Sequence, residues 1–400
     1  MQQAQVDLKR ARDLLGKNGL DAVIAYGGAN FYYLTGFQNY FDNPAGSMAL
    51  LPADESIEPW MLVGDWMLQA ATPFRFGELV TFPMWMEIVD LEQLRTQVPV
   101  RSGRPVRFDV EANIRRLADA IKARGLVRGR IGIELSVVSV SVFEMLRKHL
   151  PDVTWDNSLP VLFEMRAYKT TQEIDYLRQA TRLTEDAMLA VVAEPIEGCS
   201  INDLKLRYEA ACNVLARQAS LAGFQGTRVT ASIGADVSPV LAGGPVATAD
   251  DLVFFDVGSS IFGYGSDTGR TLTSTKPAQE ARDMLDAVRA GLEAAFELVR
   301  PGSRMCDVFH AGQDAVRKRG MQWFTRGHVG HTMGLGMGEM PPFLAPKEMR
   351  PLEPGMVMAL EIPLYVRGLG GFQIEECFVV TGTGYDLLTS LPRDFLTAPQ

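Results

Sequence analysis

The chain has 400 residues, of which 47% are hydrophobic and 22% charged, and its formal net charge is −9. This composition predicts a soluble globular protein that is large enough for two domains. The negative charge and the lack of a basic stripe argue against a nucleic-acid partner. No apolar run approaches the ~20 residues that would cross a bilayer, which argues against a membrane partner.

The first 26 residues predict an amphipathic helix followed by a strand, and not a signal peptide. Four cysteines show no CxxC spacing, which predicts buried, reduced thiols in a cytoplasmic protein. They are Cys199, Cys212, Cys306 and Cys377.

Residues 1–158 alternate between helical and strand patterns and predict an α/β domain with a mostly sheet core. The predicted helices cover residues 6–18, 111–126 and 140–152, and the predicted strands cover residues 21–26, 30–37, 47–54, 59–65 and 129–135. A connecting segment is predicted at residues 154–170.

Residues 159–400 predict a second, catalytic domain in which an antiparallel sheet is backed by long helices. Apolar residues spaced by about 3.6 predict helices over residues 171–194, 202–219, 280–299 and 305–320, the last with Gly320 as its C-cap. The fold class of the whole chain is therefore α/β (α+β).

Two stretches in this second domain each predict a β-hairpin that carries two carboxylates. The acids are Asp256 and Asp267 in LVFFDVGSSIFGYGSDTGRTLT, and Glu361 and Glu375 in LEPGMVMALEIPLYVRGLGGFQIEECFVV. Turns near residues 260–262 and 367–370 would place the two acids of each hairpin roughly opposite each other. Opposed residues of an antiparallel pair share one face, with Cβ atoms about 5 Å apart.

Four carboxylates pressed together inside an apolar fold would repel strongly unless protons or cations were present. Two divalent cations would balance the four charges, and His331 would supply a nitrogen ligand. Cys377 is a weaker candidate ligand, because the other ligands are mostly hard oxygens. The sequence therefore predicts a metal site with two ions.

Several stretches, in this order and spacing, resemble the pita-bread metallopeptidases, a family that includes prolidase, aminopeptidase P, methionine aminopeptidase and the metal-free creatinase. They are FFDVG with SDTGRT, GHVGHTMGL, LEPGMVMALE and QIEE. NFYYLTGF and MRAYKTTQEIDYLRQA are similar to the amino-terminal domain and the interdomain connector of the prolidase and creatinase branch. The resemblance implies a creatinase-like α/β domain, a pita-bread catalytic domain and a homodimer.

The resemblance also implies a role for each ligand. Asp256 would chelate one ion, and Asp267 and Glu375 would bridge both ions. His331 and Glu361 would complete the second ion, and Glu361 would also accept a proton from water. The ions would be Mn²⁺ or Co²⁺, with Zn²⁺ or Fe²⁺ as alternatives. A hydroxide bridging them would attack the bond before a carboxyl-terminal proline.

The chain departs from the family pattern at three positions. Gly338 stands seven residues after His331, where the family usually has a histidine, and the region of Pro239 lacks the histidine that usually precedes the first aspartate. Loss of both imidazoles would cost transition-state binding unless other donors replace them. Gln373 replaces an arginine, which removes a charged partner of the metal carboxylates.

Three further residues are candidates for the site. His328 is either a replacement proton donor or a histidine with no role. Arg367, in the turn of the second hairpin, either binds the free carboxylate of a dipeptide or is a solvated turn residue. Tyr365 in the same hairpin is a candidate for substrate binding, with packing as the alternative.

Three functions stay open. The leading hypothesis is a cytoplasmic Xaa-Pro dipeptidase with two metal ions that acts on small peptides. The second keeps the fold and acts on a small non-peptide amide, amidine or related zwitterion, because the two histidines are absent. The third is a non-catalytic binding protein, which the complete set of ligands disfavours.

Overall fold

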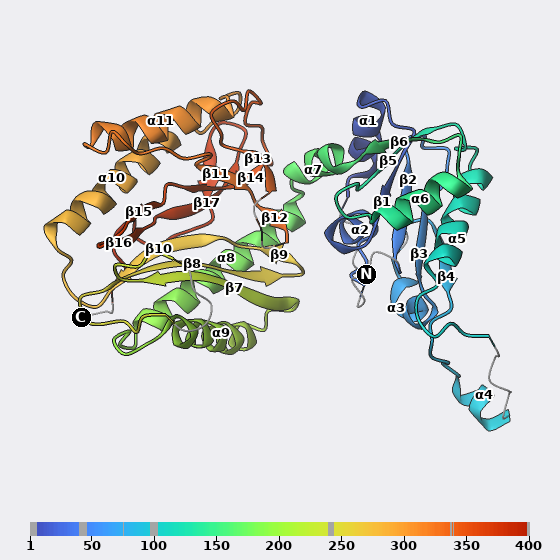
Figure 1. The fold of residues 1–400 in the computed structure, drawn as a ribbon, viewed down its shortest axis with the longest axis horizontal. Coiled ribbons are helices and arrows are strands. Elements are labelled where there is room, and N and C mark those ends of the chain that lie inside the picture. Colours follow the sequence, from blue (N-terminus) through green and yellow to red (C-terminus); the bar gives the residue numbers. More distant parts are fainter. Residues whose placement is uncertain are drawn as a thin grey trace. The chain divides into compact units, whose positions relative to one another are not determined.

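The computed structural model describes residues 6–39, 46–74, 76–96, 103–238, 244–336, 338 and 340–397. The chain divides into two compact units, Met1–Arg166 and Ala167–Gln400 (Figure 1). The sequence placed this boundary after residue 158, where helix α7 (Leu159–Ala167) begins. Within the described ranges, no helix is both long and apolar enough to cross a membrane.

The first unit is built on a six-stranded mixed sheet in the order β4-β3-β2-β1-β5-β6. Strands β1 and β2 are buried along their whole length, as expected for a sheet covered on both faces. The strands are β1 (Ala22–Ala25), β2 (Met48–Pro52), β3 (Trp60–Gly64), β4 (Glu78–Phe82), β5 (Arg130–Ile133) and β6 (Thr154–Asn157). The helices are α1 (Leu8–Lys17), α2 (Gly28–Thr35), α3 (Leu68–Ala71), α4 (Leu91–Thr96), α5 (Val110–Ala123) and α6 (Val140–His149).

The strand predicted at residues 30–37 is wrong, because these residues form most of helix α2 and its end. Residues 30–35 are all buried, so the helix has no polar face that a periodic pattern could reveal. The helix ends at Gly36, whose φ is +71° and whose N–H donates to the Tyr32 carbonyl at 2.7 Å. Glycine takes this left-handed conformation without strain, so Gly36 was the overlooked helix-end signal.

The predicted connector also holds more regular structure than expected. Strand β6 lies within it and extends the sheet by pairing in parallel with β5. Its two end residues are exposed and its two middle residues half-buried, with no alternation, since it lies at the edge of the sheet. Helix α7 follows at once and carries the chain into the second unit.

The second unit contains two five-stranded sheets and a small hairpin. The first sheet has the order β10-β8-β9-β12, with β7 paired to β8, and the second has the order β13-β11-β14-β17-β18. The strands of the first sheet are β7 (Phe224–Ile233), β8 (Leu252–Ile261), β9 (Tyr264–Gly265), β10 (Thr268–Thr273) and β12 (Gly334–Leu335). Those of the second sheet are β11 (Gly330–Thr332), β13 (Met340–Phe343), β14 (Val357–Glu361), β17 (Glu375–Val380) and β18 (Tyr385–Leu387), and the hairpin is β15 (Leu364–Val366) with β16 (Gly370–Phe372).

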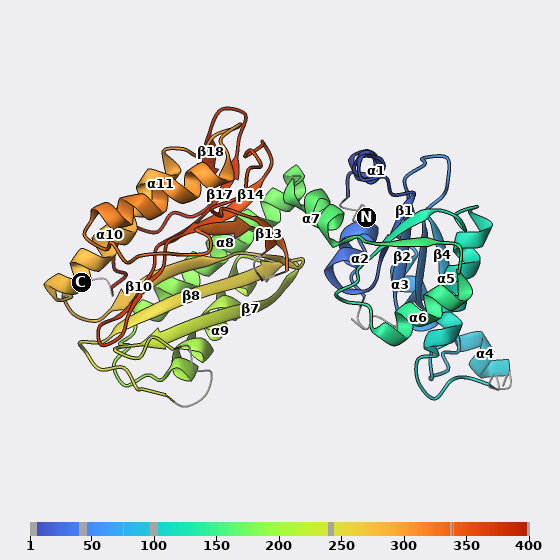
Figure 2. The same cartoon turned by 45° about the horizontal axis from the view of Figure 1, so that its top comes forward.

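Helices cover the outer faces of this two-sheet core. Figures 1 and 2 show α9 on the outer side of β7 and β8, and α10 and α11 on the outer side of the second sheet. The predicted helices are confirmed as α8 (Thr171–Val192), α9 (Ile201–Gln218), α10 (Gln279–Phe296) and α11 (Met305–Lys318). Capping boxes at Thr170 and Ser200 fix the first turns of α8 and α9.

The second carboxylate hairpin has the predicted register, but the first is shifted. Glu361 lies directly opposite Glu375, as expected. In the first hairpin Asp256 lies opposite Gly269, so Asp267 is two residues away on the same face of the sheet. The turn is centred on Phe262 and Gly263, whose φ values of +49° and +78° fit a two-residue hairpin turn that requires positive φ at both positions.

Candidate metal centre

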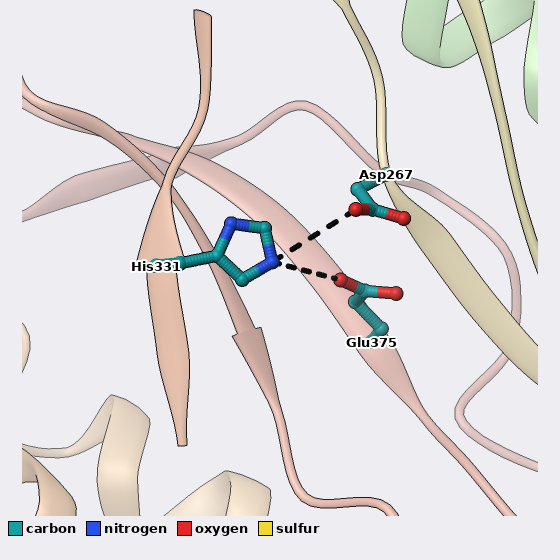
Figure 3. A group of neighbouring side chains, drawn as sticks. All are labelled: Asp267, His331 and Glu375. Carbon is teal, nitrogen blue, oxygen red and sulfur yellow. Dashed lines mark ion pairs between the residues drawn. The ribbon is translucent and has the colours of Figure 1, made fainter. Parts of the chain in front are cut away.

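Three buried side chains converge between the two sheets of the second unit. His331 lies in β11, Glu375 begins β17, and Asp267 directly precedes β10. His331 Nε2 lies 3.8 Å from Asp267 Oδ2 and 3.8 Å from Glu375 Oε1 (Figure 3). The possible ligand atoms of all three residues lie within 4.8 Å of one another. We refer to Asp267, His331 and Glu375 as the ligand triad.

A fully buried arginine joins the two strands that bring the acids of the triad together. The Nη1 atom of Arg270 in β10 donates to the Glu375 carbonyl at 2.7 Å, and its Nη2 atom donates to Glu376 Oε1 at 3.0 Å. The Cys377 thiol donates to the Asp267 carbonyl at 2.7 Å. These contacts hold Asp267 against the first residues of strand β17, and they give Cys377 a structural role.

Gln373 orients one acid of the triad. This side chain is completely buried, and its Nε2 atom donates to Glu375 Oε2 at 3.0 Å. The other oxygen of Glu375 then faces His331. A Cβ atom at Gly269 would lie 2.3 Å from the Gln373 side chain, so glycine at that position makes room for the amide. A neutral donor therefore stands where the resemblance led us to expect an arginine.

Glu375 carries the strongest electrostatic signature of the site. Burial raises the pKa of its carboxyl group well above the ordinary value, and the charges of Asp256 and Glu361 raise that pKa further. The charges of Arg228 and Arg270 lower the pKa but do not offset the rise. The ionised carboxylate thus lacks sufficient counter-charge, which a divalent cation would supply.

Asp256 is held by Arg228 in β7, a residue that the sequence analysis did not single out. The Nη2 atom of Arg228 donates to Asp256 Oδ1 at 2.7 Å, and it also forms an ion pair with Asp267 Oδ1. Burial lowers the pKa of Arg228, but the charges of Asp256 and Glu375 outweigh this effect and raise it overall. The guanidinium group therefore stays charged and links the two aspartates.

Glu361 faces a second arginine and a histidine. Its Oε1 atom lies 3.3 Å from Arg326 Nη2 and 3.9 Å from His328 Nδ1. The His328 and His331 rings are 6.3 Å apart between centroids, at an angle of 82°. His328 therefore lies beside His331 of the ligand triad and close to Glu361.

The two candidates for substrate binding lie in the β15–β16 hairpin. The Tyr365 ring packs against Phe254 at a centroid distance of 5.2 Å. Loss of water around its hydroxyl raises the pKa of Tyr365 to about 12, and the nearby Glu361 charge contributes to that rise. Arg367 is exposed at the hairpin turn, where its charge helps to lower the pKa of Asp236 after the larger effect of hydrogen bonds from Ser238.

Of the two positions that lack the usual histidines, only Gly338 lies within the described residues. Gly338 is exposed, and a Cβ atom added there would meet nothing within 4 Å among the described residues. Pro239 lies outside the described residues.

The ligand triad fits one divalent cation, since it offers one imidazole nitrogen and two carboxylates from a rigid, buried frame. The resemblance assigns a further ion to Asp256 and Asp267. As arranged here these two acids do not fit that ion, because Arg228 is paired with both of them. The prediction of two ions therefore stays a prediction.

Arg228 and Arg326 are the site residues that the sequence analysis missed. Arg228 is the single charged residue in the stretch FQGTRVTASI, which could have marked it as a residue with a buried partner. Arg326 directly precedes GHVGH, but arginines beside a turn are common, and nothing in the sequence distinguishes this one.

Comparison with known proteins shows which chains this one is similar to. An Xaa-Pro dipeptidase of Lactobacillus helveticus is 28% identical over 295 residues, covering 71% of this chain and 76% of that protein. An uncharacterised peptidase of Bacillus subtilis is 22% identical over 389 residues, covering 97% of this chain and 99% of that protein. The solved Xaa-Pro dipeptidase from Bacillus anthracis has a TM-score of 0.80 at 19% identity, and a recombinant prolidase from Thermococcus sibiricus has a TM-score of 0.79 at 21% identity, each covering 98% of both chains.

Family models cover both units. Residues 8–168 match the creatinase/prolidase N-terminal domain, and residues 175–382 match metallopeptidase family M24, which is more than half of the chain. The expected two-domain architecture and the expected hydrolase class are thereby confirmed. With its triad of buried ligands inside that fold, the chain belongs to metallopeptidase family M24.

Proposed function

We propose that this metallopeptidase is an Xaa-Pro dipeptidase, which hydrolyses the bond before a carboxyl-terminal proline in small peptides. The observation that carries the proposal is the buried triad of Asp267, His331 and Glu375. The proline preference is supported by relatives that are themselves Xaa-Pro dipeptidases.

When bound at the triad, a divalent cation supplies Lewis acidity to the substrate carbonyl and lowers the pKa of a water molecule. Mn²⁺ and Co²⁺ suit the mixed oxygen and nitrogen ligands. Side chains of this protein carry out the proton transfers. Glu361 accepts a proton from the attacking water, and its position directly opposite Glu375 supports this role. His328 donates a proton to the leaving nitrogen, and its closeness to Glu361 supports this role.

The β15–β16 hairpin is proposed to receive the substrate. Tyr365 lies close enough to the site for the charges of Glu361, Asp256 and Glu375 to affect its pKa. Arg367 lies two residues further along and is exposed, so its guanidinium group is available to a peptide carboxylate. Arg367→Gln should raise KM for an Xaa-Pro dipeptide and leave KM unchanged for a substrate whose terminal carboxyl is amidated.

The test is hydrolysis of an Xaa-Pro dipeptide by protein that has been stripped with a chelator and reloaded with Mn²⁺ or Co²⁺. We expect activity to disappear on chelation and to return with the metal. The matched control is the dipeptide with proline in first place, which should not be cleaved. If the reloaded, folded protein hydrolyses no Xaa-Pro substrate, the proposal fails.

Gly338 favours a second candidate function on the same scaffold, hydrolysis of a small non-peptide amide or amidine. No imidazole can extend from Gly338, and the space around it within the described residues is open. A peptide would miss the donor that the family usually places there, whereas a smaller zwitterion would need it less. Faster turnover of small amides than of any Xaa-Pro dipeptide would select this candidate.

The remaining expectations concern the oligomeric state and the cellular location of the protein. We propose a cytoplasmic homodimer, supported only by the resemblance to the prolidase and creatinase branch. Sedimentation at micromolar concentration tests the assembly directly, and a monomer under those conditions would refute it.

A further inference from the structure

We infer that this chain binds a single divalent cation, at the ligand triad, because the guanidinium group of Arg228 takes the place of the other ion between Asp256 and Asp267. The inference rests on the proposed metal site and is independent of the proposed substrate. It changes the expected metal content of the protein from two ions to one.

The register of the first sheet directs Arg228 into the site. In the pairing of β7 with β8, Thr230 lies opposite Asp256, and Arg228 lies opposite Gly258. Because side chains alternate between faces along a strand, Arg228 and Thr230 share the face that Asp256 occupies. Gly258 has no side chain to compete for this space, and a Cβ atom there would lie 2.2 Å from the Ser266 carbonyl.

The contacts of Arg228 are those that a cation between the two aspartates would make. One nitrogen, Nη2, pairs with Oδ1 of Asp256 and with Oδ1 of Asp267. The other terminal nitrogen donates to the Thr230 hydroxyl at 3.3 Å, which steadies the guanidinium plane. The Arg228 side chain is 25% exposed, so these ion pairs are partly shielded from water.

Charge balance then limits the site to one divalent ion. Two guanidinium groups, those of Arg228 and Arg326, face the same four carboxylates for which the sequence alone suggested two divalent ions. With both arginines in place, one divalent cation at the ligand triad already neutralises the remaining negative charge. A further ion would have to displace Arg228 from both aspartates and would meet its positive charge at close range.

The experiment is a count of bound ions by calorimetric titration of Mn²⁺ into the metal-free protein, with elemental analysis of the dialysed product. We expect one ion per chain in the natural protein and two in Arg228→Gln, which removes the charge and keeps a side chain of similar shape. Arg228→Lys keeps the charge and should bind one ion. The Mn²⁺ electron paramagnetic resonance spectrum should show isolated ions in the natural protein and an exchange-coupled pair in Arg228→Gln.

The matched control is Arg104→Gln in the first unit. Arg104 also bridges two carboxylates, with distances of 2.6 Å to Asp65 and 2.6 Å to Glu87, and its loss should leave the count at one. Circular dichroism of each variant verifies the fold. Two tightly bound ions in the natural protein, no ion in it, or a single ion in folded Arg228→Gln would each overturn the inference. A correct ion count without Xaa-Pro hydrolysis would refute the proposed substrate alone.

Discussion

The two carboxylate hairpins of the second unit differ in how the negative charge of their acids is neutralised. In the β8–β10 hairpin, Asp256 and Asp267 are both paired with Arg228. In the β14–β17 hairpin, Glu361 is near Arg326, but Glu375 is oriented only by a neutral amide and has a strongly raised pKa. The aspartates of the first hairpin therefore have a counter-charge in the neighbouring strand β7, whereas Glu375 in the second hairpin still requires one.

This difference indicates where a bound cation would be stabilised most. An ion near Glu375 relieves an unbalanced buried carboxylate, whereas an ion near Asp256 must compete with a guanidinium group that is already in place. His331 belongs to the sheet of the second hairpin, since β11 pairs with β14, and its Nε2 atom lies 3.8 Å from both Glu375 and Asp267. The hairpins thus contribute unequally to metal binding, although their sequences look equivalent.

The largest expected effect comes from removing the nitrogen ligand on the side of the second hairpin. His331→Ala should lower kcat/KM by roughly a thousandfold or more, because the Lewis acid that it helps to hold is worth several kcal/mol. Steady-state assays at saturating Mn²⁺ measure this change. His310→Ala, an exposed histidine on α11, is the control and should keep full activity. Equal activities of the two variants would contradict the assignment of His331.

The next effect tests the link between the hairpins. Arg270→Gln removes the hydrogen bonds of the guanidinium group to the Glu375 carbonyl and to buried Glu376, which keeps Arg393 as a charged partner, and should lower the free energy of unfolding by about 3 kcal/mol. Guanidinium unfolding followed by circular dichroism gives the value. Arg304→Gln breaks an exposed pair with Asp307 and should change the free energy of unfolding far less, because water screens that pair. A similar cost for both variants would show that Arg270 does not join the strands.

The pH dependence of stability should reveal the unbalanced carboxylate. The pKa of Glu375 is raised in the folded state, so above about pH 4.3, the ordinary value for glutamate, the folded protein holds a proton that the unfolded chain has lost. The metal-free protein should therefore become less stable as pH rises through this window. Bound metal or Glu375→Gln should flatten the slope, and unfolding midpoints across pH measure it. An unchanged slope in Glu375→Gln would exclude this residue as the cause.

The smallest effect concerns the neutral donor behind Glu375. Gln373→Leu removes the hydrogen bond to Oε2 and should weaken Mn²⁺ binding by about tenfold, as for other partners of metal ligands. Calorimetric titration measures the affinity. Asn30→Leu in the first unit, where a buried amide donates to Glu134 Oε1 at 2.6 Å, is the control for loss of a buried amide. Unaltered affinity in Gln373→Leu would mean that strand pairing alone orients Glu375.

Most helices and strands could be predicted from local sequence patterns, and each wrong prediction has a specific physical cause. The four long helices of the second unit were found because each buries one stripe of apolar residues, as Leu285, Leu292 and Phe296 do in α10. Helix α2 was missed because its residues from Asn30 to Thr35 are all buried and show no period. In such a segment only the glycine at its end marks the helix.

The site was partly predictable for a similar reason. Glu361 and Glu375 were placed correctly because the turn length fixed their register. The register of Asp256 and Asp267 depended on whether Phe262 accepts a positive φ, which its side chain does not suggest. The isolated charge in FQGTRVTASI could mark Arg228 as a residue with a buried partner, but its position beside Asp256 could not be predicted, since β7 joins β8 across a long segment and no local pattern sets that register.

Anomalous diffraction from crystals grown with Mn²⁺ tests the central claim most directly. We predict one anomalous peak, bounded by Asp267, His331 and Glu375, with Arg228 still lying between Asp256 and Asp267. The account would be contradicted by density for no ion at the triad, or by a second peak at Asp256 with Arg228 turned away.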